Sequence, residues 1–545
     1  MSGEGTVRRR RLRDRLPVRL RQHWRPTAAL GVGLASMVWF LGDARISPYV
    51  TSSSRVEADA ITENVEGTVD LYDTSAEHSI QLTYEQTDFD KMMKEFKEDG
   101  TKDYIEADLV IDGVYLNDVG IRLKGNSTLS SLRGGGRGMP GGGEGGFGGG
   151  RELPEGAQGG AAAGGTGAPG GAGGMGGMVQ YNLSAEKPEE LPWLVKIDEY
   201  VEGRAYQGER EISLRPGSNG QVPLNEALSL SLTEKSGQKA ERYGFTELKV
   251  NNRPAVTRLM VEAPDTDYAD DVADGNGVLY KAKASGSFEY RGDDPTEYES
   301  SFKQLNKKGS QDLEPVMKLI KWVDSASDEE FARDLDQYVD VGSLAAYLAA
   351  QNLLLNFDDM AGPGKNYLLW YDLDTKKFSV LGWDYNLTFS GDAGAGPDDS
   401  ISMGGGMPGG GAGQEGLPEG APEGFPEGMP EGLPEGAPEG MPEGMPEGMP
   451  GGRQGGGGGG GSMQHALKTR FLAADAFDDV YKEAYRELYR KFYGSGTAAK
   501  ELKAVAEQAR ANGAGSEELD TAVTRLTKTV IDRTAALAED KDVTG

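Results

Sequence analysis

Two glycine-rich tracts limit what this chain can fold into more than any other feature. Gly134–Gly177 and Gly391–Gly461 hold 24 and 28 glycines, which together make 52 of the 82 in the chain. Such segments have too few apolar side chains to offset the conformational entropy lost on ordering. Once the N-terminal segment is also set aside, about 400 residues remain for a packed core. We therefore expect one large two-lobed core with the tracts as loop insertions.

The inventory of reactive side chains excludes several classes of protein. The chain has no cysteine, which excludes thiol nucleophiles, iron–sulfur clusters, cysteine-bound zinc and disulfides. Only His78 and His465 lie beyond the N-terminal segment, which argues against a Ser-His-Asp hydrolase or a multi-histidine metal site. A net charge of −30 argues against a nucleic-acid partner. Carboxylates, amides, lysines and arginines are left to carry any chemistry.

The N-terminus has the pattern of an export or anchoring signal. Nine arginines fall within the first 25 residues, and an apolar run of 16 residues follows from Thr27 to Gly42. A basic flank before an apolar stretch is typical of signal peptides and signal anchors. We predict a basic cytoplasmic segment over 1–26 and a signal anchor or signal peptide over 27–44. The rest would lie outside the cytoplasm, at the cell membrane or secreted; the alternative is a core helix behind a basic tail.

The order of predicted elements favours an α+β fold. Between residues 70 and 128 the pattern is strand-like, and more strands surround one helix near Val222–Ser236. Beyond residue 310 apolar residues recur at helical spacing, up to an amphipathic tail over His465–Asp540. A short β-hairpin interrupts these helices on either side of residue 374. Strands followed by helices predict a β-rich N-lobe and a helical C-lobe.

The lobe boundaries and insertions are predicted as follows. The folded domain spans 65–545, with the N-lobe at about 65–265 and the C-lobe at about 266–545. The Gly-rich insertion covers 134–178, and the second insertion, rich in Gly and Pro-Glu-Gly repeats, covers 391–463. Both are expected to be disordered, because loop closure costs little extra as a loop lengthens.

The densest polar cluster is NFDDMAGPGKNYLLWYD, from Asn356 to Asp372, directly after an apolar helix. Asp384 follows twelve residues later, at the end of a β-run. Carboxylates and amides at element ends suit a hard divalent cation, for which Asp384 and Asn366 are candidate ligands. Asp358 could orient or deprotonate a hydroxyl group. The alternative is ordinary helix termination and turn chemistry.

Five ordered blocks carry a resemblance to a known family. They are Asn356–Asp358, Lys365–Tyr371, Gly382–Phe389, IRLKGNST at 121–128 and LPWLVKIDEYVEGRAYQG at 191–208. Together they resemble the spore coat protein H (CotH) kinase family, an atypical protein-kinase-like group that phosphorylates exported proteins. The resemblance implies a kinase-like fold, ATP as phosphoryl donor and Mg²⁺ or Mn²⁺ as cofactor.

The same resemblance implies roles for individual residues. Asp358 matches the catalytic-loop aspartate that accepts the proton of the substrate hydroxyl. Asn366 matches the catalytic-loop asparagine, and Asp384 matches the metal-binding aspartate. Asn386 stands where the family often has a second aspartate, which implies a weaker second metal position.

Kinase chain order extends these assignments to the nucleotide. Lys196 would pair with Glu226 of the first helix and hold phosphates by charge-assisted contacts. We favour Lys196 over its rival Lys281 because only Lys196 precedes that helix. The remaining candidates for nucleotide binding are Arg122, Lys124, Asn126 and Ser127. Each charged residue also has a structural alternative, such as an exposed strand position or the first turn of a helix.

The resulting hypothesis is an ATP-dependent kinase that acts on hydroxyl side chains of exported or cell-surface proteins. Asn386 and the single glycine at Gly125 motivate a rival, a non-catalytic kinase-like scaffold. The net charge motivates a second rival, a cation-binding adhesion module. The second insertion follows Asp384, where kinases have their activation segment, so it could gate or recruit substrate; the alternative is a solvated loop.

Overall fold

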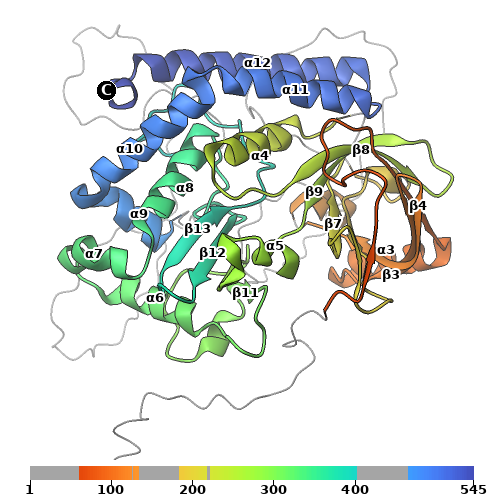
Figure 1. Ribbon diagram of the computed structural model, residues 1–545, viewed down its shortest axis with the longest axis horizontal. Coiled ribbons are helices and arrows are strands. Elements are labelled where there is room, and N and C mark those ends of the chain that lie inside the picture. The colour runs from red at the N-terminus through yellow and green to blue at the C-terminus, as the bar shows by residue number, and fades with distance from the viewer. Residues whose placement is uncertain (1–59, 126, 134–182, 218–220, 402–463) are drawn as a thin grey trace, which may run out of the picture. The chain divides into compact units, whose positions relative to one another are not determined.

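The computed structural model describes residues 60–125, 127–133, 183–217, 221–401 and 464–545 (Figure 1). The predicted signal segment and most of both predicted insertions lie outside these residues, so those predictions stay open. Within the described residues, no helix combines the length and the apolar character needed to cross a membrane. The described part contains both helices and sheets, which confirms the α+β class.

The first half of the described chain forms a closed barrel of seven strands. Buried and exposed residues alternate along its strands, most regularly from Ser79 to Tyr84, because successive side chains point to opposite faces. β2 and β8 pair in parallel and the other neighbours are antiparallel. In barrel order the strands are β2 (Ser79–Tyr84), β3 (Ile105–Ile111), β4 (Val114–Leu123), β5 (Trp193–Lys196), β7 (Glu211–Leu214), β9 (Val256–Glu262) and β8 (Tyr243–Val250). A short parallel pair, β1 (Glu63–Val65) with β6 (Arg204–Tyr206), lies outside this barrel order.

The first glycine tract lies between two strands that pair directly. Leu123 at the end of β4 pairs with Trp193 at the start of β5. The strands on either side of the tract are therefore direct neighbours in the barrel; the prediction of a Gly-rich insertion over 134–178 stays a prediction.

Helix α3 (Gln86–Asp99) was not predicted, because the whole region from 70 to 128 was interpreted as strands. Its buried face consists of Phe89, Met92, Met93 and Phe96, which is helical spacing. Phe89 stacks on Tyr84 with ring centroids 5.3 Å apart, so the helix packs against the end of β2. Gly100 ends the helix at φ 86°, a left-handed conformation that glycine adopts without strain.

A second sheet and most of the helices form the rest of the described chain. The sheet order is β11 (Phe302–Gln304), β10 (Gly277–Ala282), β12 (Tyr367–Asp372) and β13 (Phe378–Gly382), all antiparallel. β12 and β13 are the predicted hairpin. The helices are α4 (Leu224–Ser236), α5 (Thr266–Asp270), α6 (Glu314–Ser325), α7 (Asp328–Asp334), α8 (Val341–Leu353), α9 (Ala466–Ala473), α10 (Asp478–Tyr489), α11 (Thr497–Ala511), α12 (Ser516–Glu539) and α13 (Lys541–Thr544).

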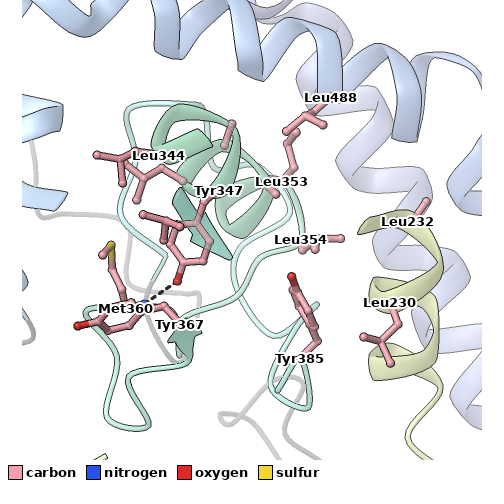
Figure 2. Close-up of a cluster of buried hydrophobic side chains, with 14 of the residues drawn as sticks. Leu230, Leu232, Leu344, Tyr347, Leu353, Leu354, Met360, Tyr367, Tyr385 and Leu488 are labelled. Carbon is pink, nitrogen blue, oxygen red and sulfur yellow. Dashed lines mark hydrogen bonds between the residues drawn. The ribbon is translucent and has the colours of Figure 1, made fainter. Parts of the chain in front are cut away.

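The main hydrophobic core surrounds α8. Helix α10 packs along α8, while α4 packs against α11, which lies beside α12 (Figure 1). Although α4 lies between barrel strands in the sequence, Leu230 and Leu232 belong to this helical core (Figure 2). Tyr385, which follows β13, belongs to the same core. Helix α4 therefore connects the barrel to the helices.

Residues 391–401 lie within the predicted second insertion but have defined partners. Arg533 of α12 donates to the backbone carbonyl groups of Ala393 and Ala395, and Tyr481 of α10 donates to that of Pro397 at 2.8 Å. The Asn352 side chain of α8 donates to the Gly396 carbonyl at 3.1 Å. The predicted start of the insertion at 391 was therefore too early, since glycine content does not reveal backbone contacts made by distant helices.

Candidate functional site

The loop between α8 and β12 carries the polar cluster. The hydroxyl of Tyr347, on α8, accepts a hydrogen bond from the Met360 N–H at 2.9 Å (Figure 2). The same hydroxyl donates to the Asn366 carbonyl at 3.2 Å. Tyr347 is fully buried, so these bonds form away from water. One core side chain thus fixes both ends of the segment that follows Asp358.

Asp358 is buried inside this loop. Its carboxylate accepts hydrogen bonds from the Gly364 N–H and from Asn366 Nδ2, the latter at 3.1 Å. Burial raises the pKa of Asp358 to about 7; the negative charge of Asp384 acts in the same direction and the Gly364 N–H opposes it. A carboxyl group with a pKa near neutrality can accept a proton from a bound hydroxyl group.

Asn366 joins the two predicted acidic positions. Its Nδ2 atom lies 3.1 Å from Asp358 Oδ2 and 3.3 Å from the backbone carbonyl oxygen of Asp384. Asp384 follows β13 at φ 58°, a left-handed conformation that costs a non-glycine residue energy and often marks functional sites. The three residues predicted from the sequence therefore meet at one place.

The partner of Glu226 is an arginine, which corrects the predicted Lys196–Glu226 pair. Glu226 lies in the first turn of α4, is 1% exposed, and forms an ion pair with Arg215. The same guanidinium lies 3.2 Å from Asp384 Oδ1. Arg215 comes directly after β7, so the barrel supplies the cation that connects α4 to Asp384.

Lys196 has other partners. Its ammonium nitrogen lies 2.7 Å from Glu199 Oε2 and 3.6 Å from Asp198 Oδ1, both on the turn after β5. The first helix does follow Lys196 in the sequence, but chain order does not determine which side chains meet. Lys196 therefore forms ion pairs with carboxylates close to it in the sequence and not with Glu226.

Comparison with known proteins identifies the family of the chain. The family model described as CotH kinase protein matches residues 182–511, more than half of the chain. The chain belongs to this family. Inner spore coat protein H of Bacillus subtilis (strain 168) is 23% identical over 198 residues, covering 35% of this chain and 54% of that protein. The chain thus spans about half the length of this curated relative.

In this CotH family protein, Lys281 lies beside the residue before Asp384, and among the described residues neither Lys281 nor Lys124 forms an ion pair with a carboxylate. Lys281 on β10 lies over the Trp383 ring, 3.3 Å from its centroid, and Trp383 precedes Asp384. Burial lowers the pKa of Lys281, and the charge of Lys124 lowers it further. Burial also lowers the pKa of Lys124 to about 8, with Arg215 acting in the same direction. Chain order favours Lys196 over Lys281 for the phosphate contact. In the structure, however, Lys281 is the lysine beside Asp384.

The predicted metal ligands provide oxygen atoms that suit a hard cation. In the described ranges, no three His, Cys, Asp or Glu side chains gather into a metal site by themselves, so any site here depends on amides. Asn386 Oδ1 is buried and accepts no hydrogen bond from the described residues. Asp384 Oδ1 likewise has only its ion pair with Arg215. Carboxylate and amide oxygens are the donors that Mg²⁺ and Mn²⁺ prefer, so the residues fit.

The other nucleotide-binding candidates are placed only in part. The Arg122 guanidinium lies over the Tyr104 ring, 5.1 Å from its centroid, and donates to the carbonyl of its neighbour Leu123. Asn126 and the side chain of Ser127 lie outside the described residues, so their predicted role remains open.

Sequence reasoning missed Arg215 and Glu241. Glu241 precedes β8, is buried, and accepts a long hydrogen bond of 3.4 Å from the Asp384 N–H. Burial raises the pKa of Glu241 to about 7, while Arg215 acts in the opposite direction. No motif marks either residue; the sequence offers only a charged side chain close to the end of a strand, Arg215 directly after β7 and Glu241 two residues before β8.

Proposed function

We propose that this CotH family protein transfers the γ-phosphoryl group of ATP to hydroxyl side chains of exported or cell-surface proteins. The observation that carries the proposal is the meeting of Asp358, Asn366 and Asp384 around one amide group. A proton acceptor beside oxygen donors for a cation is the arrangement that phosphoryl transfer requires. Family membership supports the same reaction class.

Each residue would contribute positioning or charge. Asp358 would accept the proton of the acceptor hydroxyl group, and its pKa of about 7 keeps a substantial fraction ionised at neutral pH. Asn366 would hold the Asp358 carboxylate toward the site through its 3.1 Å hydrogen bond. Arg215 would fix Asp384 against α4 through Glu226.

Asp384, Asn366 and Asn386 are the residues that would hold Mg²⁺ or Mn²⁺. A cation there, when bound, neutralises the charge of the phosphates during transfer. The asparagine at 386 contributes no formal charge, so we propose that a second cation binds more weakly than the first.

The finer description of the fold is part of the proposal. We infer that the barrel with α4 corresponds to the N-lobe of a kinase-like fold, with the lobe boundary near residue 265, and that the second sheet and remaining helices correspond to the C-lobe. Arg215, directly after barrel strand β7, and Asp384, after β13 of the second sheet, form an ion pair, which supports a nucleotide site where these parts meet.

The location and partners are also inferred. The Bacillus subtilis relative is named as an inner spore coat protein, which supports an extracytoplasmic or surface location for this chain. The basic and apolar N-terminal segment supports export, with attachment to the membrane if the segment is retained. We infer that the partner is an exported or surface protein with accessible hydroxyl groups.

The test is transfer of radiolabelled phosphate from ATP by the full-length chain in the presence of Mn²⁺, with a serine-rich protein as acceptor. We expect Asp358→Asn and Asp384→Asn each to lower the rate at least a hundredfold, as removal of a general base or metal ligand does. Asp374→Asn, on the exposed turn between β12 and β13, is the matched control and should keep the rate. Unchanged activity in both site variants would overturn the proposal.

Failure of the folded wild-type chain to transfer phosphate would favour one of two rival functions. Thermal stabilisation by Mn²⁺ but never by nucleotide would indicate a cation-binding adhesion module. Stabilisation by neither would indicate a non-catalytic scaffold.

A further inference from the structure

Helix α9 contacts the loop that carries Asp358, although the helix comes much later in the chain. Its Lys468 forms an ion pair with Asp359 Oδ2, across 109 positions of the sequence. His465, the residue before the helix, places its Nε2 atom 3.0 Å from the hydroxyl of Tyr367, the first residue of β12. The start of α9 therefore touches this loop beside Asp358 and at its junction with β12.

Asp359 organises this loop through its backbone and its side chain. Its carbonyl oxygen accepts hydrogen bonds from the N–H groups of Gly362 at 3.0 Å and Asn366 at 3.2 Å. Its Oδ1 atom accepts the N–H of Ala361 at 2.8 Å. Asp358 is the preceding residue, and the Asn366 side chain donates to it. The position of Asp359 therefore sets the positions of both groups that meet at the proposed site.

The carboxylate of Asp359 depends on Lys468 for an opposite charge. Asp359 is only 5% exposed, and in the described part of the chain Lys468 is the one cation within ion-pair distance of it. A buried carboxylate is costly to hold in place unless it is both hydrogen-bonded and paired with a cation. The ion pair therefore decides whether Asp359, and the loop organised by it, stays in this conformation.

Helix α9 is itself fixed against other helices. Leu467 is fully buried in the main hydrophobic core. Arg470 donates to the carbonyl group of Ala326 at 2.8 Å and lies 2.9 Å from the carboxylate of Asp328, at the junction of α6 and α7. Lys468 therefore reaches the loop from a helix that has anchors of its own, so it can hold Asp359 in one place.

We infer that Lys468 is a positioning residue for phosphoryl transfer, which holds the Asp358 carboxylate in place through Asp359. This inference rests on the proposed function. The alternative is a purely structural ion pair, whose loss would lower the stability of the chain but leave the rate of the folded protein unchanged. Because a displacement of about 1 Å in a reacting group can lower a rate about 100-fold, the two roles differ measurably.

Phosphate transfer by full-length variants, measured well below the unfolding temperature of each, tests this role. We expect Lys468→Met to lower kcat at least tenfold. Lys468→Arg, which keeps the charge and a donor, should stay within threefold of the wild type. Lys482→Met is the matched control, because the Lys482 side chain is 26% exposed against 27% for Lys468 and also pairs with an aspartate, Asp542. This control should keep the wild-type rate.

A double-variant cycle shows whether Lys468 acts through Asp359. Asp359→Asn should also lower kcat, and Lys468→Met combined with Asp359→Asn should be no slower than Lys468→Met alone, because the two residues share one contact. The double variant leaves no buried charge without a partner, so it replaces Lys468→Met if that variant does not fold, and it should still be at least tenfold slower than the wild type. Losses that multiply in the double variant would overturn action through Asp359.

Amide hydrogen exchange reports on the loop without the reaction. The peptide over 358–366 should exchange faster in Lys468→Met than in the wild type, and at the wild-type rate in Lys482→Met. Unchanged exchange of that peptide in Lys468→Met, or a full transfer rate in that variant, would overturn the positioning role. Faster exchange in Lys468→Met, together with a wild type that transfers no phosphate, would retain the hold of Lys468 on the loop and refute the phosphotransferase.

Discussion

Replacing Tyr347 by phenylalanine removes one oxygen atom from the core and leaves two backbone groups without a partner. The Met360 N–H and the Asn366 carbonyl both bond to that hydroxyl, and both residues are buried. An unsatisfied buried polar group costs about 1–3 kcal/mol, so for two such groups we expect a loss of about 2–6 kcal/mol in the free energy of unfolding. Because the loop carries Asp358, phosphate transfer should fall as well.

Tyr280→Phe is the matched control. The Tyr280 side chain is equally buried, but its hydroxyl donates only to the carbonyl of Asp312, an exposed residue, at 2.7 Å. Its removal should cost about 1 kcal/mol, because water can reach the released carbonyl group. Urea unfolding of both full-length variants measures the difference. Equal losses in the two variants, with transfer unaffected in Tyr347→Phe, would refute the idea that Tyr347 fixes the loop.

Three further changes test other parts of the molecule. In Gly364→Ala the new methyl carbon would lie 2.5 Å from Asp358 Oδ2, so the carboxylate must move; we expect phosphate transfer at least tenfold lower with little change in unfolding temperature, and an unchanged rate would contradict the placement of Asp358. Burial alone would lower the pKa of His78, but hydrogen bonds, chiefly to Asp112, raise it overall above 6.5. The stability from that pair should therefore be complete below pH 6.5 and decline as the pH rises through the folded-state pKa. The wild type should lose stability relative to His78→Gln across that range, and parallel pH profiles would refute this. Arg533→Met should cost about 3 kcal/mol, since the buried guanidinium donates to the carbonyl groups of Ala393, Ala395 and Asn352 and its removal leaves the buried Ala395 carbonyl without that donor. A cost below about 1 kcal/mol in urea unfolding would show that residues 391–401 are held by other contacts.

The sequence predicted those parts of the fold whose patterns are local. The α+β class, the β12–β13 hairpin and helix α4 follow from periodicity and turn residues within short windows. Helix α3 was missed because its four buried residues lie between two clear strands and the helix is otherwise highly charged. Barrel closure depends on the parallel pairing of β2 with β8, which are more than 150 residues apart and share no local motif.

In the candidate site too, features that depend on local sequence could be predicted, whereas features that depend on tertiary packing could not. Asp358, Asn366 and Asp384 were identified because they lie within one short stretch of sequence at the ends of recognisable elements. The ion pair of Arg215 with Glu226 depends on how α4 packs against the barrel, and the position of Lys281 beside Trp383 depends on how β10 and the end of β13 lie in the second sheet. Chain order favoured Lys196, but two nearby carboxylates already occupy that lysine. Ion-pair choice is a three-dimensional property that spacing along one chain does not determine.

The edge strands of the barrel and of the second sheet affect how readily one molecule could pair with another through backbone hydrogen bonds. An open strand edge presents unpaired backbone groups that can template pairing with another molecule, and closure of the barrel removes such edges from its seven strands. In the second sheet, Val339 forms a bridge with Phe378 of edge strand β13, and the Asp340 N–H bonds to the Phe378 carbonyl at 2.8 Å. The opposite edge, β11, is only three residues long. In the described part of the chain, the remaining open edges belong to short strands such as β11 and the three-residue strands β1 and β6, so these residues can be crowded at high local density while offering little backbone for β-type aggregation.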